Sequence, residues 1–473
     1  MQRPSILSGI PGSAALKKSG GWPALGWPPV RGEAEGAPSI GAVIDQGAIR
    51  TVFQPVVHIE SHTIAGFEAL SRGPINSRLE TPLALLQAAS RAGRLSELDW
   101  LCRVHALQAA TEANLPPDLS WLINVEPAGL AIECPAHLRA AEARAKASLR
   151  VILEVVERDV EGHVSELLNA TDQARRDSWG VALDDVGAEA GSLALLPFLR
   201  PDVVKLDMSL VSTVQRCDAA SITAAVRAYS ERTGAVILAE GIETLAQEQL
   251  AQVFGATYAQ GYRYGRPGSL PHTVAAPTHI IPLRQRLTPV CGMTPFDILA
   301  ASMKPRREAK AQLLHISHHL EEQSGRGGEA SVLLASLPDS SQFSHRQRQR
   351  YEHLSRLNAF TVVQAAGAKA QSAPRYRITS FNNQDQLKGE WAVIVVSPHF
   401  ASAFIARDCG DTGNEAERRY DYIYTHNRDA VIAAARSFLH QLSPDSKPAL
   451  AGDVRSIVEG LAATSAHLSL QNH

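Results

Sequence analysis

The chain has 473 residues, which is too long for one ordinary domain and long enough for two domains with cores of their own. Hydrophobic residues make up 45% of it and charged residues 20%, a balance typical of a folded protein and not of a disordered one. Because 46 Lys and Arg residues nearly balance 48 Asp and Glu residues, the formal net charge of -2 excludes a global attraction to nucleic acid or to an anionic membrane.

The five cysteines are far apart in the sequence, and no Cys-x-x-Cys pair occurs. This pattern argues against a disulfide framework and a structural zinc site, and it is typical of proteins in a reducing cytoplasm. No apolar run approaches the roughly 20 residues that cross a bilayer. Lys17 and Lys18 are not followed by the apolar stretch of a secretory signal. We therefore predict a cytoplasmic protein without a membrane span.

The first part of the chain is predicted to be a flexible leader followed by a large α/β domain. Residues 1–39 are rich in Gly, Pro, Ser and Ala and cannot bury enough apolar surface to offset their ordering entropy. In residues 40–270, strand-like apolar runs alternate with amphipathic helix-like segments such as 97–113 and 217–234. The expected strands are 64–70, 120–125, 149–157, 179–186, 201–207 and 234–242. This alternation predicts a (β/α)8 TIM-like barrel.

A smaller domain of mixed α and β character is expected after the barrel. A linker rich in Pro and His, residues 271–292, precedes this domain, which we place at residues 293–442, with a loosely attached tail at 443–473. Its expected elements are a helix at 298–324, strands at 329–338 and 390–398, and a closing helix at 427–442.

Acidic and other polar side chains stand at or near the ends of the expected barrel strands. They are Glu68, Asn124, Glu154, Asp184, Asp185, Lys205 and Glu240, with Glu243 three residues further on. A carboxylate among Val, Ile and Leu is costly to bury unless it is paired or binds a cation, and a single one is most often structural. Seven at successive strand ends indicate a site, because the carboxyl ends of barrel strands converge on one face.

The residue types of this set favour particular cations. Carboxylate and amide oxygens select Mg²⁺ or Mn²⁺, and the absence of Cys and His from the set argues against zinc. Several carboxylates around one centre can hold two cations about 3.5–4 Å apart, an arrangement used in phosphoester hydrolysis. The pattern therefore predicts a two-metal site and a phosphate ester as substrate.

Residues 43–267 resemble the EAL domain, which is named for a Glu-x-Leu motif that stands here as Glu68-Ala69-Leu70. Further motifs follow in the family's order. They are Gln54-Pro55, Asn124 in INVEP, Glu154-Val155-Val156-Glu157, Asp184-Asp185-Val186-Gly187, Lys205 in VVKLD, Glu240-Gly241-Ile242-Glu243-Thr244, and Gln260 to Pro267. The resemblance implies hydrolysis of cyclic-di-GMP, a bacterial second messenger, to linear pGpG with a water activated by two metal ions. It also implies a homodimer formed through the EAL domain.

The resemblance also implies roles for individual residues. The implied ligands of the first metal are Glu68, Asn124, Glu154, Asp184 and Glu240, and Asp185 would contribute to the second. Lys205 would contact or orient the attacking water, so that Glu240, Lys205 and Glu68 are the candidate catalytic residues. Arg72 would bind a substrate phosphate, with Gln54, Leu70 and Gln260 as further substrate-binding candidates. Glu157 and Glu243 would support neighbouring loops and ligands.

One segment departs from the family's pattern. After Asp184-Asp185 the family usually has Phe-Gly-Thr-Gly-Tyr-Ser-Ser-Leu, whereas this chain has Val186-Gly187-Ala188-Glu189-Ala190-Gly191-Ser192-Leu193. The altered loop 186–191 favours an alternative function, a receptor that binds cyclic-di-GMP without cleaving it. The retained ligand set favours the enzyme. A scaffold that acts through partners alone would leave that set without a purpose.

The C-terminal block resembles the DICT domain, a presumed sensory module. The matching residues are His318-His319-Leu320-Glu321, Arg350-Tyr351, Glu390-Trp391, Ala406-Arg407-Asp408 and the helix after Asn427-Arg428. The resemblance implies regulation by an unknown ligand or protein partner. His315 and His319 would share a helix face, but no Cys or further His cluster accompanies them, so a helix surface is favoured over a metal site.

Overall fold

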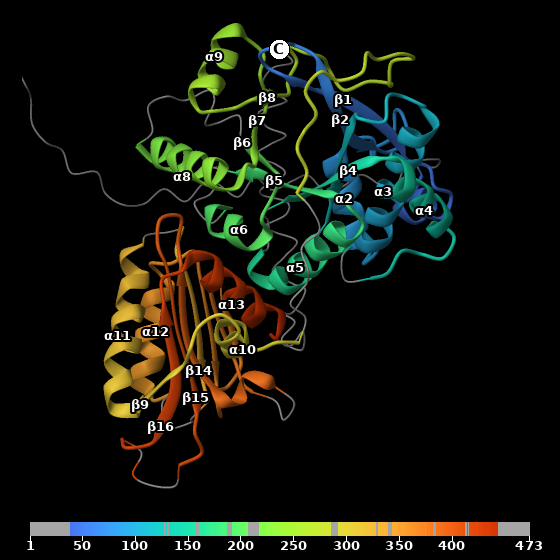
Figure 1. Cartoon of the computed structure of the whole chain (residues 1–473). Helices are drawn as coiled ribbons and strands as arrows, with labels where there is room; N and C mark the ends of the chain where they lie inside the picture. Colours follow the sequence, from blue (N-terminus) through green and yellow to red (C-terminus); the bar gives the residue numbers. More distant parts are fainter. Residues whose placement is uncertain are drawn as a thin grey trace, which may run out of the picture. The chain divides into compact units, whose positions relative to one another are not determined.

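The computed structural model describes two folded domains, which are coloured blue to yellow-green and yellow to red in Figure 1. The described residues are 38–126, 129, 132–156, 160–186, 192–206, 217–284, 292–327, 330–338, 343–373, 375–381, 385–411, 414 and 416–442. Of residues 156, 160–166, 192, 217–219 and 372 only the backbone is described. Glu157, the loop residues 187–191, the predicted tail and nearly all of the predicted leader lie outside the described residues.

The first domain is a closed barrel of eight strands in sequence order, which confirms the predicted α/β barrel. Its strands are β1 (Arg50–His58), β2 (Ile64–Arg72), β3 (Ser120–Val125), β4 (Arg150–Val156), β5 (Gly180–Val186), β6 (Val203–Leu206), β7 (Val236–Ala239) and β8 (Tyr258–Ala259). Its helices are α1 (Ile40–Asp45), α2 (Pro82–Arg91), α3 (Leu95–Glu112), α4 (Arg139–Ser148), α5 (Val160–Arg176), α6 (Ser192–Leu199), α8 (Cys217–Thr233) and α9 (Leu245–Val253). All six expected strands are present.

Strand β1 departs from an all-parallel barrel. It runs antiparallel to both of its neighbours, β2 and β8. The chain turns from β1 into β2 through residues 59–63, which is too short for the crossover that a parallel pair needs. The other neighbouring pairs, from β2·β3 to β7·β8, are parallel.

An apolar layer fills the interior of the barrel. It consists of inward-facing residues from the strands, namely Val56, Ala65, Leu122, Ile152, Ala182, Val203, Leu238 and Tyr258, together with Ile281. Ile281 comes from the segment after β8 and is fully buried, and its carbonyl oxygen accepts a hydrogen bond of 2.8 Å from Arg150 Nη2. Part of the segment predicted as a linker is therefore packed against the barrel.

The second domain is built on one mixed sheet of eight strands in the order β12-β13-β11-β10-β14-β15-β16-β9. The strands are β9 (Arg306–Ala309), β10 (Val332–Leu337), β11 (Phe360–Ala365), β12 (Gln371–Ala373), β13 (Tyr376–Thr379), β14 (Glu390–Val396), β15 (Ala401–Asp408) and β16 (Arg419–Thr425). The helices are α10 (Pro295–Ala300), α11 (Lys310–Arg326), α12 (His345–Ser355), the short η4 (Gln386–Gly389) and α13 (Arg428–His440).

Helices cover both faces of this sheet. Alternate residues of β10 and β14 face opposite sides: Leu333 and Val393 pack with Leu313 of α11, whereas Leu334 and Ile394 belong to the cluster that contains Phe438 of α13. All seven residues of β14 are buried, which explains its continuous apolar run.

The prediction of one continuous helix at residues 298–324 is wrong. Helix α10 ends at Ala300, and residues Arg306–Ala309 form the edge strand β9, which pairs with β16. Pro305 lacks a backbone N–H and disfavours helical backbone at Lys304. An ion pair between Arg307 and Asp421, with a distance of 2.8 Å between Nε and Oδ1, joins β9 to β16.

The described residues also bear on the predictions about membrane spans and cysteines. No helix among them is both long and apolar enough to cross a membrane. Cys102, Cys134 and Cys409, whose side chains are described, carry free thiols.

Candidate active site

A ring of polar side chains lies directly above the apolar layer of the barrel. In each of the strands β3 to β8, the polar residue of the ring stands two positions after the residue that the strand contributes to the apolar layer. In the antiparallel strand β1, the polar residue stands two positions before the apolar residue. The ring consists of Gln54, Glu68, Asn124, Glu154, Asp184, Lys205, Glu240 and Gln260. Because side chains in a strand alternate between faces with a period of two, both layers point into the barrel. The fold therefore brings the predicted strand-end residues together.

Lys205 stands at the centre of this ring. Its Nζ lies 2.8 Å from Glu154 Oε1, 2.9 Å from Asp184 Oδ1, 2.9 Å from Glu240 Oε1 and 3.6 Å from Glu68 Oε1. Its side chain is 1% exposed, whereas the side chain of Glu240 is 20% exposed. One ammonium group thus faces four carboxylates, and Glu240 lies on the side that solvent can reach.

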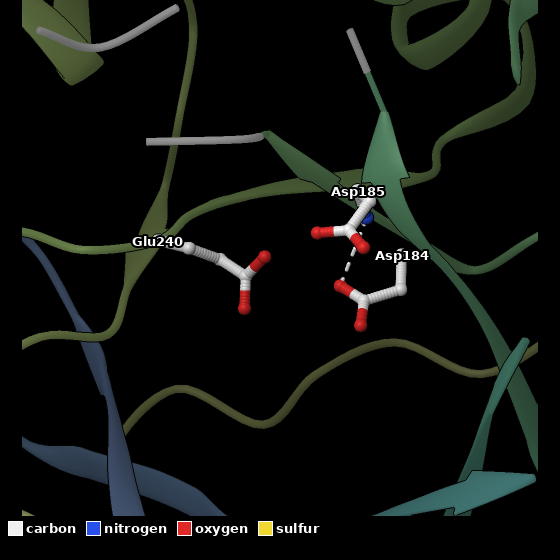
Figure 2. A group of neighbouring side chains, drawn as sticks. All are labelled: Asp184, Asp185 and Glu240. Atoms are coloured by element: carbon white, nitrogen blue, oxygen red, sulfur yellow. Dashed lines mark hydrogen bonds between the residues drawn. The ribbon is translucent and has the colours of Figure 1, made fainter. Parts of the chain in front are cut away.

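A local irregularity places two consecutive aspartates in the same site. The register between β5 and β6 shifts between Leu183 and Val186, and Asp185 has a left-handed φ of 55°. Consecutive strand residues otherwise point to opposite faces, so a bulge is needed to turn both carboxylates inward. Figure 2 shows the result: Asp184 and Asp185 extend from one side of the site toward Glu240 on the other. One ligand oxygen from each of the three residues lies within 4.8 Å of the others.

Amide side chains link Glu68 to its neighbours in the ring. Asn124 Nδ2 donates a hydrogen bond of 3.1 Å to Glu68 Oε1, and Gln260 Nε2 donates to Glu68 Oε2. Gln260 Nε2 also donates to Gln54 Oε1 at 2.9 Å, and Gln54 Nε2 donates to the carbonyl oxygen of Gly265 at 3.1 Å. These bonds fix Glu68 and connect it to the segment that follows β8.

Burial and crowding shift the protonation equilibria of the ring. Burial, together with the charge of Glu68, raises the pKa of Glu154 well above its ordinary value, and Lys205 only partly opposes this. Burial and the charge of Asp184 likewise raise the pKa of Glu240. Burial disfavours the ammonium of Lys205, but the charges of Asp184, Glu154, Glu240 and Glu68 outweigh it and raise the Lys205 pKa. The Lys205 ammonium lowers the pKa of Asp184 despite its burial.

The donor set of the ring fits divalent cations. With Asp185, the site holds five carboxylates and one ammonium group, so it carries an excess of four negative formal charges if all groups are ionised. Glu154 Oε2 is buried and accepts no hydrogen bond from any residue that the structure describes. An unpaired buried carboxylate oxygen costs free energy that coordination to a cation would recover. All candidate ligand atoms are oxygens, as Mg²⁺ and Mn²⁺ prefer.

The remaining predicted site residues are more dispersed. Arg72 is half-buried at the end of β2, where burial lowers its pKa and the charge of Glu68 opposes the shift. Leu70 lies on the same strand and is also half-buried. The side chain of Glu243 is exposed, and its backbone N–H donates to Gln247 Oε1 at 2.8 Å. Glu157 lies outside the described residues.

Sequence reasoning missed one acid that holds the segment after β8. Glu248 of α9 is buried, and its Oε2 accepts hydrogen bonds from Arg263 Nε at 2.7 Å and Tyr264 Oη at 2.6 Å. Tyr264 also packs against the core. A helical acid with neighbours of opposite charge gives no distinct signal in a single sequence.

The histidines of the second domain form no metal site among the described residues. His315 and His319 are exposed on α11, and the one group of potential metal-ligating side chains in the described part of the chain is that of Asp184, Asp185 and Glu240.

Comparison with known proteins identifies both domains. The EAL domain model matches residues 39–267, and the model of the sensory domain in diguanylate cyclases and two-component systems (DICT) matches residues 298–408. The probable cyclic di-GMP phosphodiesterase PdeD of Escherichia coli K12 is 32% identical over 120 residues, which are 25% of this chain and 22% of that protein. PdeG, a second probable cyclic di-GMP phosphodiesterase of this strain, is 26% identical over 231 residues, which are 47% of this chain and 45% of that protein.

A solved structure of Klebsiella pneumoniae BlrP1 in complex with manganese and cyclic di-GMP is 26% identical, with a TM-score of 0.42, and the match covers 47% of this chain and 56% of that one. The chain spans less than half the length of the two curated relatives. The two family models thus identify an EAL domain at residues 39–267, followed in the sequence by a DICT domain at residues 298–408.

Proposed function

We propose that the barrel is a metal-dependent phosphodiesterase that hydrolyses cyclic-di-GMP to linear pGpG. The observation that carries the proposal is the ring together with Asp185: five carboxylates, Asn124 and Lys205 converge at the carboxyl ends of the barrel strands. The relatives named as probable cyclic di-GMP phosphodiesterases support the choice of substrate.

The same ring would hold the cations, which we propose to be Mg²⁺ or Mn²⁺. Glu68, Asn124, Glu154, Asp184 and Glu240 would bind the first and Asp185 would contribute to the second. When bound, two such cations supply the positive charge that acidifies a water molecule and offsets charge on the phosphate in the transition state.

The residues of the chain would act by holding charge in place. Lys205 is buried among four carboxylates, and an ammonium group fixed in this position would orient the attacking water through its charge. Glu240 would act from the exposed side of the ring together with Glu68. The guanidinium of Arg72 would bind a substrate phosphate through paired donors. Gln54, Leu70 and Gln260 would line the substrate site, and Glu157 and Glu243 would support neighbouring ligands.

The proposal includes the setting of the enzyme. We propose a homodimer formed through the EAL domain and a cytoplasmic location, which the dispersed cysteines favour. The DICT domain would regulate the barrel in response to a ligand or partner.

Chromatography of the full chain incubated with cyclic-di-GMP tests the proposal. We expect pGpG with Mg²⁺ or Mn²⁺, inhibition by Ca²⁺ because of its looser coordination, and loss of product in Glu68→Ala. Glu231→Ala is the matched control, because Glu231 is an exposed acid on α8 that pairs with Arg227. Intact substrate that binds in equilibrium dialysis would instead establish a receptor. Neither binding nor cleavage would overturn both functions.

A further inference from the structure

The DICT domain contains an open groove between α11 and α12, above one face of its sheet. Its cavity volume is about 1320 Å³, more than the roughly 300–1,000 Å³ of typical small-molecule pockets. Leu314, Ser317 and His318 line it from α11, and Leu337 and Trp391 line it from the sheet. The groove therefore has an apolar floor and walls made by two helices.

The floor holds a hydrogen-bond donor that has no acceptor. Trp391 is 1% exposed, and its Nε1 is buried without a hydrogen-bond partner among the described residues. Phe404 and Tyr420 pack edge-on against the indole, with ring centroids 5.0 Å and 5.9 Å away, and hold it in place. A buried N–H without an acceptor is unfavourable, so an acceptor atom that reached it from the groove would be stabilised there.

The buried acid of the groove is paired with a cation. Glu321 is 1% exposed, and its carboxylate contacts Arg350 Nε at 2.9 Å, Tyr351 Oη at 2.9 Å and Ser317 Oγ at 3.3 Å. These contacts join α11 to α12. Glu321 therefore has a structural role, and it does not repel a negatively charged ligand as a free carboxylate would.

The rim of the groove is basic. Arg326, Arg346 and Arg350 line it, against the two acids Glu321 and Glu322. His318 and His353 line it as well, and burial together with the charge of Arg350 lowers the pKa of His318. Arg346 is exposed, so its guanidinium can reach a ligand without leaving a partner in the core. The surplus of cations favours an anion over a neutral or cationic ligand.

We propose that this groove binds a small organic anion with an apolar body and one acidic group, a carboxylate or a phosphate. The apolar body would lie over Leu337 and Leu314, an acceptor atom would take the N–H of Trp391, and the acidic group would meet the rim arginines. Such a ligand is the signal that the DICT domain would sense. The inference does not depend on the activity of the barrel.

Fluorescence titration of the full chain with 8-anilinonaphthalene-1-sulfonate, an aromatic anion, tests the proposal. We expect saturable binding to one site, and binding of its uncharged analogue N-phenyl-1-naphthylamine that is at least tenfold weaker. Arg346→Gln should weaken binding of the anion roughly tenfold, the effect of one charge-assisted hydrogen bond. Arg356→Gln is the matched control, since Arg356 follows α12, lies outside the groove and is 71% exposed. Equal binding of both dyes, or equal effects of both substitutions, would overturn the proposal.

A second readout locates the site and the acidic group. The chain has six tryptophans, so a ¹⁵N-indole spectrum has six N–H signals, and Trp391→Phe identifies the one from Trp391. We expect this signal to shift on titration with the dye. Octanoate and octyl phosphate then compete with the dye, and the stronger competitor tells which acidic group is preferred. An unmoved Trp391 signal, or competition by neither anion, would refute the assignment.

Discussion

The two ends of strand β6 hold charged side chains that differ in how completely their neighbours satisfy them. Asp202, just before the strand, is fully buried and accepts hydrogen bonds from Arg175, from the Val181 N–H at 2.8 Å and from the Arg284 N–H at 2.9 Å. Lys205, three residues later, faces four carboxylates, and within the described part of the chain Glu154 Oε2 beside it accepts no hydrogen bond. The chemistry is similar, but one set is neutralised and the other carries excess charge.

This difference separates a structural set from a functional one. The Asp202 set uses each carboxylate oxygen within the protein, so it can only stabilise the fold. The ring around Lys205 leaves charge and a buried oxygen uncompensated, which costs stability and is expected where a cation and a substrate bind. Substitutions in the Asp202 set and in the ring around Lys205 should therefore have opposite effects on stability and on metal binding.

The largest expected effect on stability comes from Asp202→Ala. The substitution leaves Arg175, which is 3% exposed, as a buried charge without its partner, and such a loss costs about 3–5 kcal/mol. Urea unfolding measures the free energy, and calorimetric titration with Mg²⁺ should show unchanged affinity in the folded protein. The control is Asp45→Ala, an exposed partner of Arg94 that should cost less than about 1 kcal/mol. Equal costs for the two variants would contradict the assignment.

Glu154→Gln should have the opposite effects: it should weaken metal binding without lowering the stability of the metal-free protein. In EDTA we expect the free energy of unfolding of this variant to lie between that of the wild type and about 1 kcal/mol above it. The reason is that the amide replaces a buried carboxyl group whose ionisation is unfavourable, as its raised pKa indicates. In excess Mg²⁺ the wild type should gain about 2.7 kcal/mol at a hundredfold excess over Kd, and the variant should gain much less. Thermal unfolding with and without Mg²⁺ measures both. A variant that is destabilised in EDTA and still stabilised by Mg²⁺ would show that Glu154 is structural.

The pH dependence of stability in EDTA should show that ionised carboxylates in the ring destabilise the metal-free protein. Because the pKa values of Glu154 and Glu240 are raised, the folded state holds protons that the unfolded state has lost above about pH 4.5. The free energy of unfolding should therefore fall as pH rises from 4.5 through the raised pKa values, by at most about 1.4 kcal/mol per pH unit for each group. Lys205, whose pKa is raised, loses its contribution only at alkaline pH. Urea unfolding across this range should give a shallower slope for Glu154→Gln than for the wild type. A rise with pH would refute the shifts.

Much of the ring could be predicted from the sequence, because it follows from the period of a strand. Leu122 and Asn124, or Ile152 and Glu154, stand two residues apart, and an apolar residue followed at that distance by a polar one marks the inward face in the strands β3 to β8. Parallel alternation of strand and helix then assigns all these faces to one barrel end.

The parts that escaped prediction depend on contacts distant in sequence. The bulge that turns Asp185 inward arises from the register between β5 and β6, and β9 forms only because β16 offers an edge to pair with. The two-residue strand β8 is too short for any periodicity to mark. The groove of the DICT domain needs α11, α12 and β14 together, and no local pattern links them.

The substitution Tyr264→Phe has the smallest expected effect. It tests whether Glu248 is a structural acid, like Asp202, or a functional one, like Glu154. Glu248 is buried like Glu154, but it is bonded to Arg263 and Tyr264, and although burial opposes the shift these bonds lower its pKa. Phe keeps the packing and removes one of two hydrogen bonds, so urea unfolding should show a loss of about 1 kcal/mol. Hydrolysis of cyclic-di-GMP should stay within about threefold of the wild type, because the remaining bond from Arg263 still holds Glu248. A much larger loss of hydrolysis with the same small loss of stability would move Glu248 from the structural set to the catalytic one.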